Sequence, residues 1–473
     1  MNELTLQIDV SGKKHLYEQI YEYIKNEIRG GKLLRGEKLP STRSLAEYLQ
    51  ISRSTVDLAY EQLVSEGYIE ARPCCGYFIC KIDNLLKFQE SSYAEEKEEL
   101  PVGKNYAIDF SLNGIDMEGF PLTTWKSVYK NTLSNYGQNL FALGPAKGEW
   151  LLRETISRYL HASRGVNCTT EQVIIGAGND YLLILLEKIL GNNRSVAMED
   201  PTYKRAYRAF RSCNYEIRMI EMDRNGMRAD CLKESGADIA YVMPSHQYPM
   251  GIVMPIGRRM ELLNWATEGE ERYLIEDDYD SEFRYKGKPI PSLQASDKHG
   301  NVIYIGTFSK SIAPAIRVSY MVLPQKLLEK YEENAQFLSS TVSRTDQMML
   351  HEFISEGYFE RHLNKMRKRY KAKHDTLLAE LKPFEQYFHV MGENAGLHIL
   401  LQAKDNRLEV ELVRLAEEAD IRVYGLSETF ICRTKPEEKA TILLGYGGLS
   451  EEKIIEGIRK LKECWKVCKE TLN

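Results

Sequence analysis

The sequence has no long hydrophobic run and no export signal. No uninterrupted apolar stretch approaches the ~18 residues that a helix needs to cross a bilayer. The opening segment, MNELTLQIDV, lacks the basic stretch followed by an apolar stretch that marks a secreted protein. We therefore expect a cytoplasmic protein that has no membrane partner.

Cysteine and histidine form no pattern that would build a disulfide framework or hold a metal ion. The nine cysteines include the adjacent pair Cys74 and Cys75, while Cys464 and Cys468 stand one helical turn apart with no histidine near them. Reduced thiols and no metal site are expected. The net charge of −5 excludes a protein that coats nucleic acid with its whole surface, but it permits a local DNA-contacting patch.

The composition is that of ordinary globular material, because 43% of the 473 residues are hydrophobic and 28% are charged. Such a length predicts two or three domains. Residues 1–80 have the pattern of short helices and a hairpin. The segment 81–105 is rich in acidic residues and is interpreted as a linker, although a surface helix stays an alternative for its first part. Residues 106–473 alternate apolar runs with helical stretches, and residues 384–473 are predicted to be a small C-terminal subdomain.

The first region has the pattern of a winged helix-turn-helix. Apolar side chains recur at helical spacing over residues 16–28, and a glycine pair follows them. Ser41 and Ser52 are each placed to cap a further short helix. Two β-prone runs, residues 68–71 and 77–79, flank a turn and predict the wing.

A DNA-recognition helix needs short polar and basic side chains at its N-terminal end, where it meets base edges and phosphates. The third predicted helix begins with Arg53, Ser54 and Thr55. Arg43, early in the preceding helix, can reach a phosphate, and the turn at Gly76 would form the tip of the wing. Acidic and basic residues nearly balance in this region, so a helical protein-interaction module stays open as an alternative.

The run LPSTRSLAEYLQISRSTVDLAYEQLVSEGYIEARPCCGYFI resembles the winged helix-turn-helix of GntR-type bacterial repressors over nearly its whole length. The resemblance implies contact with operator DNA through Arg43, Arg53, Ser54, Thr55 and the wing around Gly76. One departure is visible in the wing. The family usually has a small residue there, often a glycine, and this chain has Cys74 and Cys75.

The second region contains four apolar runs that end in polar residues or lead directly into them, namely SVAMED, DIAYVMP, RYLIEDDY and NVIYIG. Their alternation with helical stretches predicts a large α/β domain with a mostly parallel sheet. Ligands of such sheets bind at the carboxyl ends of the strands. After the last run, GTFSKSIAPAIRVSY places Lys310 close to the hydroxyl groups of Thr307 and Ser309 and ahead of Arg317. This layout suits an amine that holds an aldehyde while its neighbours hold a phosphate.

Pyridoxal 5'-phosphate requires an amine for its aldehyde, an anion beside its pyridine nitrogen, a partner for its phenolic oxygen and a cradle for its phosphate. Lys310 is the candidate amine. In RYLIEDDYDSEF the strand period of two puts Asp277 and Tyr279 on one face and Asp278 on the other. An ionised Asp277 would keep the ring nitrogen protonated, and Tyr279 would meet the ring oxygen.

The phosphate has candidates of its own. The run IIGAGNDYLLILLEKIL reads as a strand, a glycine turn and a helix, so the N–H groups near Gly178 and Asn179 can point at an anion. Such turns also simply connect strands to helices. Further donors are available after the predicted strand NVIYIG, from Thr307, Ser309 and Arg317.

Residues 106–473 resemble the fold-type I aminotransferases, and their combination with the first region resembles the MocR-type (GabR-like) transcription regulators. The resemblance is carried, in order, by LGPAKGEWLLRETISRYLHASRGVNCTTEQVIIGAG, MEDPTYKRAYRAF, MPSHQYPMG, IEDDYDSEF and GTFSKSIAPAIRVSY. It implies that Lys310 is the Schiff-base lysine and that Asp277 is the partner of the pyridine nitrogen. It also implies ring contacts from Tyr279 and Tyr203 and a phosphate anchor at Arg317.

Two departures from the family bear on activity. TILLGY has Leu443 where many relatives carry an arginine for a substrate carboxylate, and Arg205 and Arg433 are the candidates that would bind an effector instead. The HQYP segment lacks the asparagine that aminotransferases often place near the ring oxygen. We therefore expect cofactor binding with at most weak transaminase activity.

The leading hypothesis is a transcription regulator that responds to a small amine or amino acid. The effector would displace Lys310 from the aldehyde and favour a different arrangement of the domains, which would change operator binding. A homodimer is expected, because fold-type I sites form at a subunit interface and operators contain paired half-sites. The alternatives are an active aminotransferase with an accessory N-terminal domain, and a structural protein with a decayed site.

Overall fold

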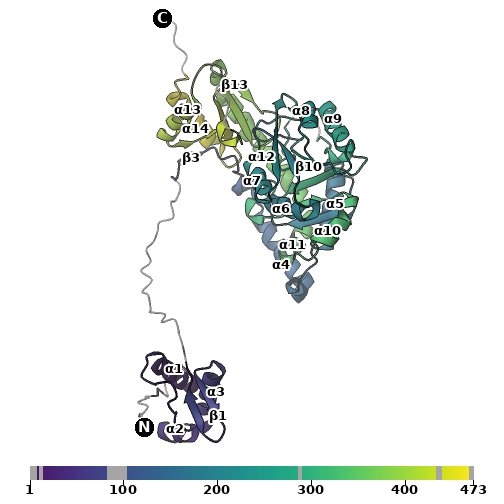
Figure 1. Ribbon diagram of the computed structural model, residues 1–473. Coiled ribbons are helices and arrows are strands. Elements are labelled where there is room, and N and C mark those ends of the chain that lie inside the picture. Colours follow the sequence, from purple (N-terminus) through teal and green to yellow (C-terminus); the bar gives the residue numbers. More distant parts are fainter. Residues whose placement is uncertain (1–7, 10–13, 82–103, 286–289, 433–438, 468–473) are drawn as a thin grey trace. The chain divides into compact units, whose positions relative to one another are not determined.

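The computed structural model describes residues 8–9, 14–81, 104–285, 290–432 and 439–467. The chain forms two compact units, Met1–Gly103 and Lys104–Asn473 (Figure 1). The linker predicted at residues 81–105 falls almost entirely outside the described residues, and so does Arg433. No helix in the described part of the chain is both long enough and apolar enough to cross a membrane.

The first unit is a winged helix-turn-helix, as the sequence predicts. Its elements are α1 (Leu16–Arg29), α2 (Thr42–Leu49), α3 (Arg53–Ser65), β1 (Ile69–Arg72) and β2 (Gly76–Ile79). The side chains of Ser41 and Ser52 cap α2 and α3 by accepting hydrogen bonds from the N–H groups of Ser44 and Thr55.

The helices of the first unit enclose one hydrophobic core with the hairpin. Ile20 and Ile24 of α1, Val56 and Leu63 of α3, and Ile79 of β2 are buried together. The strands β1 and β2 pair antiparallel, with Arg72 opposite Gly76. The turn therefore lies before Gly76, which is the first residue of β2 and not the tip of the wing.

The second unit is built on a mostly parallel sheet of seven strands, which confirms the predicted α/β class. Their order across the sheet is β4, β12, β11, β10, β9, β5 and β6. Only β12 runs antiparallel to its neighbours. The strands are β4 (Val173–Gly176), β5 (Ser195–Glu199), β6 (Glu216–Ile220), β9 (Ile239–Val242), β10 (Tyr273–Asp278), β11 (Val302–Thr307) and β12 (Ser319–Val322).

Helices cover both faces of this sheet, so its central strands are buried on both sides. One face packs on α6 (Asn179–Leu190), α7 (Lys204–Ser212) and α10 (Leu328–Asn334). The other face packs on the remaining helices of the large subdomain, which are α5 (Trp150–Arg164), α8 (Ala229–Glu234), α9 (Ile256–Thr267) and α11 (Arg344–Ser355). α4 (Leu122–Tyr136) packs on α11, and β7 (Met222–Asp223) pairs with β8 (Gly226–Met227).

The small subdomain has an antiparallel sheet in the order β13, β14, β17 and β16. Its elements are β13 (Phe388–Met391), β14 (His398–Ala403), α13 (Glu409–Glu418), β15 (Ile421–Arg422), β16 (Tyr424–Gly425), β17 (Thr441–Gly445) and α14 (Glu451–Cys464). The early strand β3 (Ile108–Asp109) pairs with β15. The start of the second unit thus joins this subdomain, which the prediction over residues 384–473 did not include.

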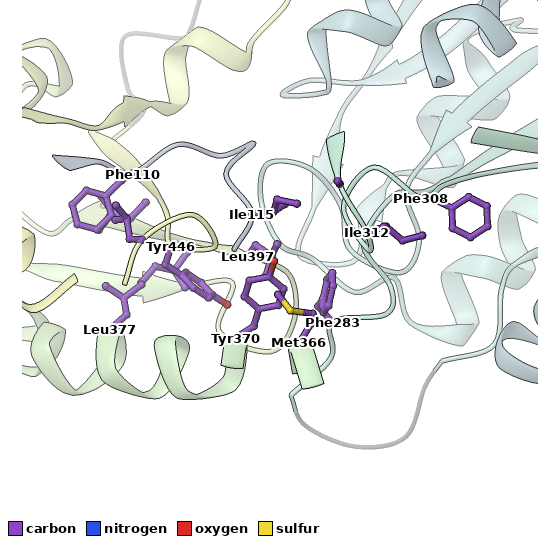
Figure 2. Packing of buried hydrophobic residues seen from close by; sticks show 14 of the residues in the cluster. Phe110, Ile115, Phe283, Phe308, Ile312, Met366, Tyr370, Leu377, Leu397 and Tyr446 are labelled. Carbon is purple, nitrogen blue, oxygen red and sulfur yellow. The ribbon is translucent and has the colours of Figure 1, made fainter. Parts of the chain in front are cut away.

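A single long helix connects the large and small parts of the second unit. α12 (Tyr358–Leu381) buries Met366, Tyr370 and Leu377. Figure 2 shows Leu377 near Tyr446 of the small part and Met366 near Phe283 of the large part, with Tyr370 between them. The shared core holds the carboxyl ends of the large sheet beside the small sheet, and that is where the site lies.

Candidate cofactor site and DNA-contacting surface

A cavity of about 230 Å³ opens at the carboxyl ends of the parallel strands. Every cofactor candidate of the second unit lines it except Gly178, which precedes the lining residue Asn179. The lining side chains come from the ends of β4, β5, β9, β10 and β11 and from the small subdomain; they include Asn179, Tyr203, Arg205, Asp277, Tyr279, Thr307, Ser309, Lys310 and Arg317. The predicted site residues therefore lie together at the carboxyl ends of the strands.

Lys310 stands in the cavity wall just after β11. Its Nζ donates a hydrogen bond to the backbone oxygen of Leu112 at 2.7 Å. The surrounding protein shields Nζ from water and lowers the pKa of the amine to about 8, against the opposing charge of Asp280. An amine with a lowered pKa is neutral more often near pH 7, which a nucleophile requires.

Asp277 and Asp278 are neighbours with different surroundings. Asp277 faces the cavity, and its carboxylate accepts hydrogen bonds from Asn179 Nδ2 at 3.0 Å and from the hydroxyl of Tyr241 at 2.5 Å. Burial raises the pKa of Asp277 to about 6, although both hydrogen bonds oppose the rise. Asp278 lies on the opposite face, paired with Arg164 Nε at 2.8 Å. The alternation read from the sequence is present.

A short network of polar side chains lies beside Asp277. The hydroxyl of Tyr279 is 3.0 Å from His246 Nδ1, and the same nitrogen is 2.9 Å from Asp280 Oδ2. His246 and Asp280 are both buried. Neither was singled out from the sequence, because their shared contact joins two strand ends that are far apart in the chain.

The opposite end of the cavity is lined by groups suited to a phosphate. Gly178 has φ +99° and caps the N-terminus of α6, so this helix directs its free N–H groups toward the cavity. A Cβ at this position would lie 2.0 Å from Nη2 of Arg317. Glycine is therefore needed for the close approach of the guanidinium, which donates to the backbone oxygen of Ala177 at 3.3 Å and lies 3.7 Å from Asp180.

The two hydroxyl candidates are held by one hydrogen-bond chain. Thr307 Oγ1 donates to Ser309 Oγ at 3.1 Å and accepts from Ser319 Oγ at 2.9 Å. The backbone N–H of Ser309 also donates to Thr307 Oγ1. Ser319 thus orients Thr307.

Aromatic side chains form the remaining wall. Tyr203 meets Tyr248 edge to face with ring centroids 5.8 Å apart, and Tyr248 meets His398 at 5.7 Å. Burial raises the pKa of Tyr203 to about 12. Arg205 is at the rim, with a side chain that is 61% exposed and 4.0 Å from Asp180. Tyr241, Tyr248 and His398 were missed from the sequence, since aromatic residues of this kind are most often core.

The residues present fit pyridoxal 5'-phosphate. The chain offers a shielded amine at Lys310, a buried carboxylate at Asp277, and a glycine cradle that a side chain at Gly178 would fill. In addition, Asn179 Oδ1 is buried without a hydrogen-bond partner among the described residues, which leaves it available to a bound group.

The candidate DNA-contacting residues gather on α2 and α3 of the first unit. The side chains of Arg43 and Arg53 are 80% and 68% exposed, and each is paired with an acid one turn along its own helix, Glu47 and Asp57 respectively. Such exposed pairs contribute little to stability, so both guanidinium groups can exchange their partner for a phosphate. Ser54 is exposed, while the hydroxyl of Thr55 bonds to the capping Ser52.

Comparisons with known proteins agree with both halves of the structure. Residues 16–79 match the family model "Bacterial regulatory proteins, gntR family", and residues 107–435 match "Aminotransferase class I and II". The chain is 42% identical to the HTH-type transcriptional regulator YdeL of Bacillus subtilis, over 96% of this chain and 97% of that protein. It is 30% identical to the probable rhizopine catabolism regulatory protein MocR of Rhizobium meliloti, over 97% and 96%.

A solved structure shows the fold of the second unit. The kynurenine aminotransferase of Pyrococcus horikoshii, crystallised in complex with PMP, superposes with a TM-score of 0.68 at 26% identity and covers 78% of this chain and 92% of its own. Since the full-length relatives and both family models agree, the chain belongs to the MocR-type family of HTH-type transcriptional regulators, in which a gntR-family domain precedes a class I and II aminotransferase domain.

Proposed function

We propose that this regulator binds operator DNA through its first unit, holds pyridoxal 5'-phosphate in the cavity of its second unit, and responds to a small amine. The observation that carries the proposal is the meeting of Lys310 and Asp277 in one cavity whose other end is bordered by the start of α6 and by Arg317. The superposed aminotransferase, whose structure contains PMP, supports the same cofactor class.

The bound cofactor would supply an aldehyde that combines reversibly with primary amines and absorbs visible light. Lys310 would hold that aldehyde, helped by its lowered pKa. Asp277 would keep the proton on the ring nitrogen, and the hydrogen bonds from Asn179 and Tyr241 fix the orientation of its carboxylate. Tyr279 would meet the ring oxygen, with Tyr203 against the ring.

The phosphate would be held by the N–H groups at Gly178 and Asn179 and by three side chains, Thr307, Ser309 and Arg317. Arg205 at the rim would contact the effector. Arg433, the other effector candidate, lies outside the described residues.

The ligand would act on DNA binding by favouring one arrangement of the units over another, because a ligand shifts an equilibrium only by its difference in affinity for the two states. A homodimer would present two recognition helices to paired half-sites. DNA contact would come from Arg43, Arg53, Ser54, Thr55 and the wing, whose second strand begins at Gly76. A protein with this role works in the cytoplasm, where the operator is.

Leu443 favours regulation over efficient transamination. Its side chain is fully buried in β17 among other leucines, at the position where an arginine would bind a substrate carboxylate. A buried leucine cannot pair with that charge. Turnover of common amino acids is therefore expected to be weak.

The test uses the full-length protein loaded with pyridoxal 5'-phosphate. Lys310→Ala should lose the visible absorbance of the bound cofactor, whereas the control Lys326→Ala, at an exposed lysine that does not line the cavity, should keep it. A gel shift on the DNA upstream of the gene, at fixed salt, measures operator binding in parallel. Unchanged absorbance in Lys310→Ala would show that Lys310 does not hold the cofactor. DNA binding without sequence preference would show that the protein does not recognise a specific operator.

A further inference from the structure

A second cavity continues from the Lys310 cavity toward the small subdomain. It measures about 210 Å³ and shares with the first the residues Leu112, Asn113, Tyr203, Arg205 and Tyr248. From there it extends to Tyr424 of β16 and Leu443 of β17. A ligand whose amine meets Lys310 therefore has room for a substituent that points at the small sheet.

The small-sheet side of this space has an apolar part around Leu443. Leu443 packs with Leu400, its partner on β14, in a buried cluster that Leu112 and Tyr424 also contact. Leu112 is the residue whose backbone oxygen receives the hydrogen bond of Lys310. The apolar wall therefore begins next to the amine and is not confined to the distant part of the cavity.

The charges near the amine have the wrong sign for a carboxylate. Asp280 is only 3% exposed and lines the cavity with Lys310. His398, on the same side, is kept neutral because burial lowers the pKa of its imidazole to about 4, and its Nε2 contacts the backbone oxygen of Pro249. His246 is already paired with Asp280.

The basic groups that line the two cavities have acidic neighbours. Of the described residues that line the two cavities, the guanidinium groups are those of Arg205 and Arg317, and both flank Asp180 at the phosphate end, at 4.0 Å and 3.7 Å. Lys204 lines only the outer cavity, which Glu428 also lines. Of these cations Arg205 lines both cavities, and the carboxylate of Asp180 already competes for it.

We propose that the effector is a primary amine whose amine-bearing carbon carries no carboxylate and whose apolar substituent lies against Leu112 and Leu443. The proposal rests on the amine-responsive function proposed above and narrows its ligand class. A carboxylate at this place would be repelled by Asp280 and would have to compete with Asp180 for Arg205, and both effects weaken binding. An alkyl or arylalkyl group buries its surface there instead.

The test titrates the cofactor-loaded wild-type protein with pairs that differ only by that carboxylate. The pairs are 2-phenylethylamine against L- and D-phenylalanine, and 3-methylbutylamine against L- and D-leucine. Visible absorbance and the thermal unfolding midpoint report binding, and the same titration of free pyridoxal 5'-phosphate corrects for the intrinsic reactivity of each compound. Each amine should reach half-saturation at a concentration about tenfold or more below its amino acids. An equal or lower value for either amino acid overturns the proposal.

Two variants of the wall sharpen the result. Leu443→Arg should shrink the amine preference, because it brings a cation to the apolar wall, while Leu443→Met keeps the size and polarity and should leave the preference unchanged. Asp280→Asn removes the repelling charge and should also shrink the preference. This variant provides the test if Leu443→Arg does not fold. A wild-type preference that survives in both Leu443→Arg and Asp280→Asn would contradict the assignment of the wall.

Failure of the wider function looks different. A visible band that no compound moves, or a Lys310→Ala variant with wild-type absorbance, removes the amine-responsive cofactor and this proposal with it. A band that depends on Lys310 but moves more readily with the amino acids removes only the ligand class proposed here.

Discussion

The surface of α2 and α3 in the first unit and the cavity of the second unit place charged groups in opposite environments. Arg43 and Arg53 stand mostly in water and pair with acids on their own helices. Asp277 and Asp280 are almost fully buried, and each accepts hydrogen bonds or ion pairs from other segments of the chain. A charge in water costs little to rearrange, whereas a buried charge depends on every partner around it.

In the first unit, the side chains that contact DNA are expected to contribute little to folding stability. In the second unit, the side chains around the cavity are expected to affect both ligand binding and stability. Substitutions on α3 should change DNA affinity and leave stability alone. Substitutions around the cavity should change stability as well as ligand binding, and the sign depends on whether the residue is paired.

The neighbours Asp277 and Asp278 give the sharpest test within the cavity unit. Asp278→Asn leaves Arg164 buried beside a neutral group and should destabilise the protein by about 3–5 kcal/mol, as expected when one partner of a buried ion pair is removed. Asp277→Asn removes a carboxylate whose pKa is raised by burial, so stability without cofactor should hold or rise. Thermal and urea unfolding of the cofactor-free proteins measure both.

Cofactor binding supplies the control for this pair. Asp277→Asn should bind pyridoxal 5'-phosphate more weakly than the wild-type protein, because the ring nitrogen loses its anion. If Asp277→Asn instead unfolds as easily as Asp278→Asn, the two faces of β10 do not have separate roles.

The sequence predicts this separation because it follows from local geometry. The strand period of two places Asp277 and Asp278 on opposite faces, and the structure assigns Tyr273 and Ile275 to one packed cluster and Leu274 to another. The helix caps Ser41 and Ser52 are local in the same sense. Patterns within one element were therefore enough for the winged helix-turn-helix, the α/β class and the strand-end position of the site.

Contacts between distant segments were out of reach. Tyr241 reaches Asp277 only because β9 and β10 pair in one register, and His398 enters from the small subdomain. β3 joins that subdomain by pairing with β15, more than three hundred residues later in the sequence. No residue pattern states which strands will pair, so partners of this kind need the folded chain.

The stability of the protein should depend on pH through a buried acid that forms no salt bridge with the described residues. Glu199 at the end of β5 is fully buried, which raises the pKa of its carboxyl from 4.5 to about 7. At a pH below the pKa of Glu199 in the unfolded chain, the carboxyl is protonated in both states, and its burial does not change the stability with pH. As the pH rises from that pKa toward the pKa of the folded protein, the Glu199 carboxyl ionises only in the unfolded chain, and the free energy of unfolding falls.

Glu199→Gln keeps the shape and removes this cost. The stability gained by the variant over the wild-type protein should therefore grow between about pH 4.5 and pH 7 and reach about 2–3 kcal/mol. Urea unfolding of cofactor-free protein across that range measures the difference. A difference that stays constant with pH would show that Glu199 is not titrating between the two states.

The smallest expected effect tests the exposed unit. Arg53→Ala on α3 should weaken operator binding about tenfold by removing a phosphate or base contact, while the unfolding midpoint and the cofactor absorbance stay unchanged. Arg29→Ala, an exposed arginine at the end of α1, is the matched control and should bind DNA nearly as the wild-type protein does. Gel shifts at several salt concentrations separate the two kinds of contact, because a lost phosphate contact lowers the salt dependence for every DNA sequence and a lost base contact relaxes preference at one position. Equal losses in Arg53→Ala and Arg29→Ala would mean that binding follows total charge, and the recognition role of α3 would then fail even though the unit is folded.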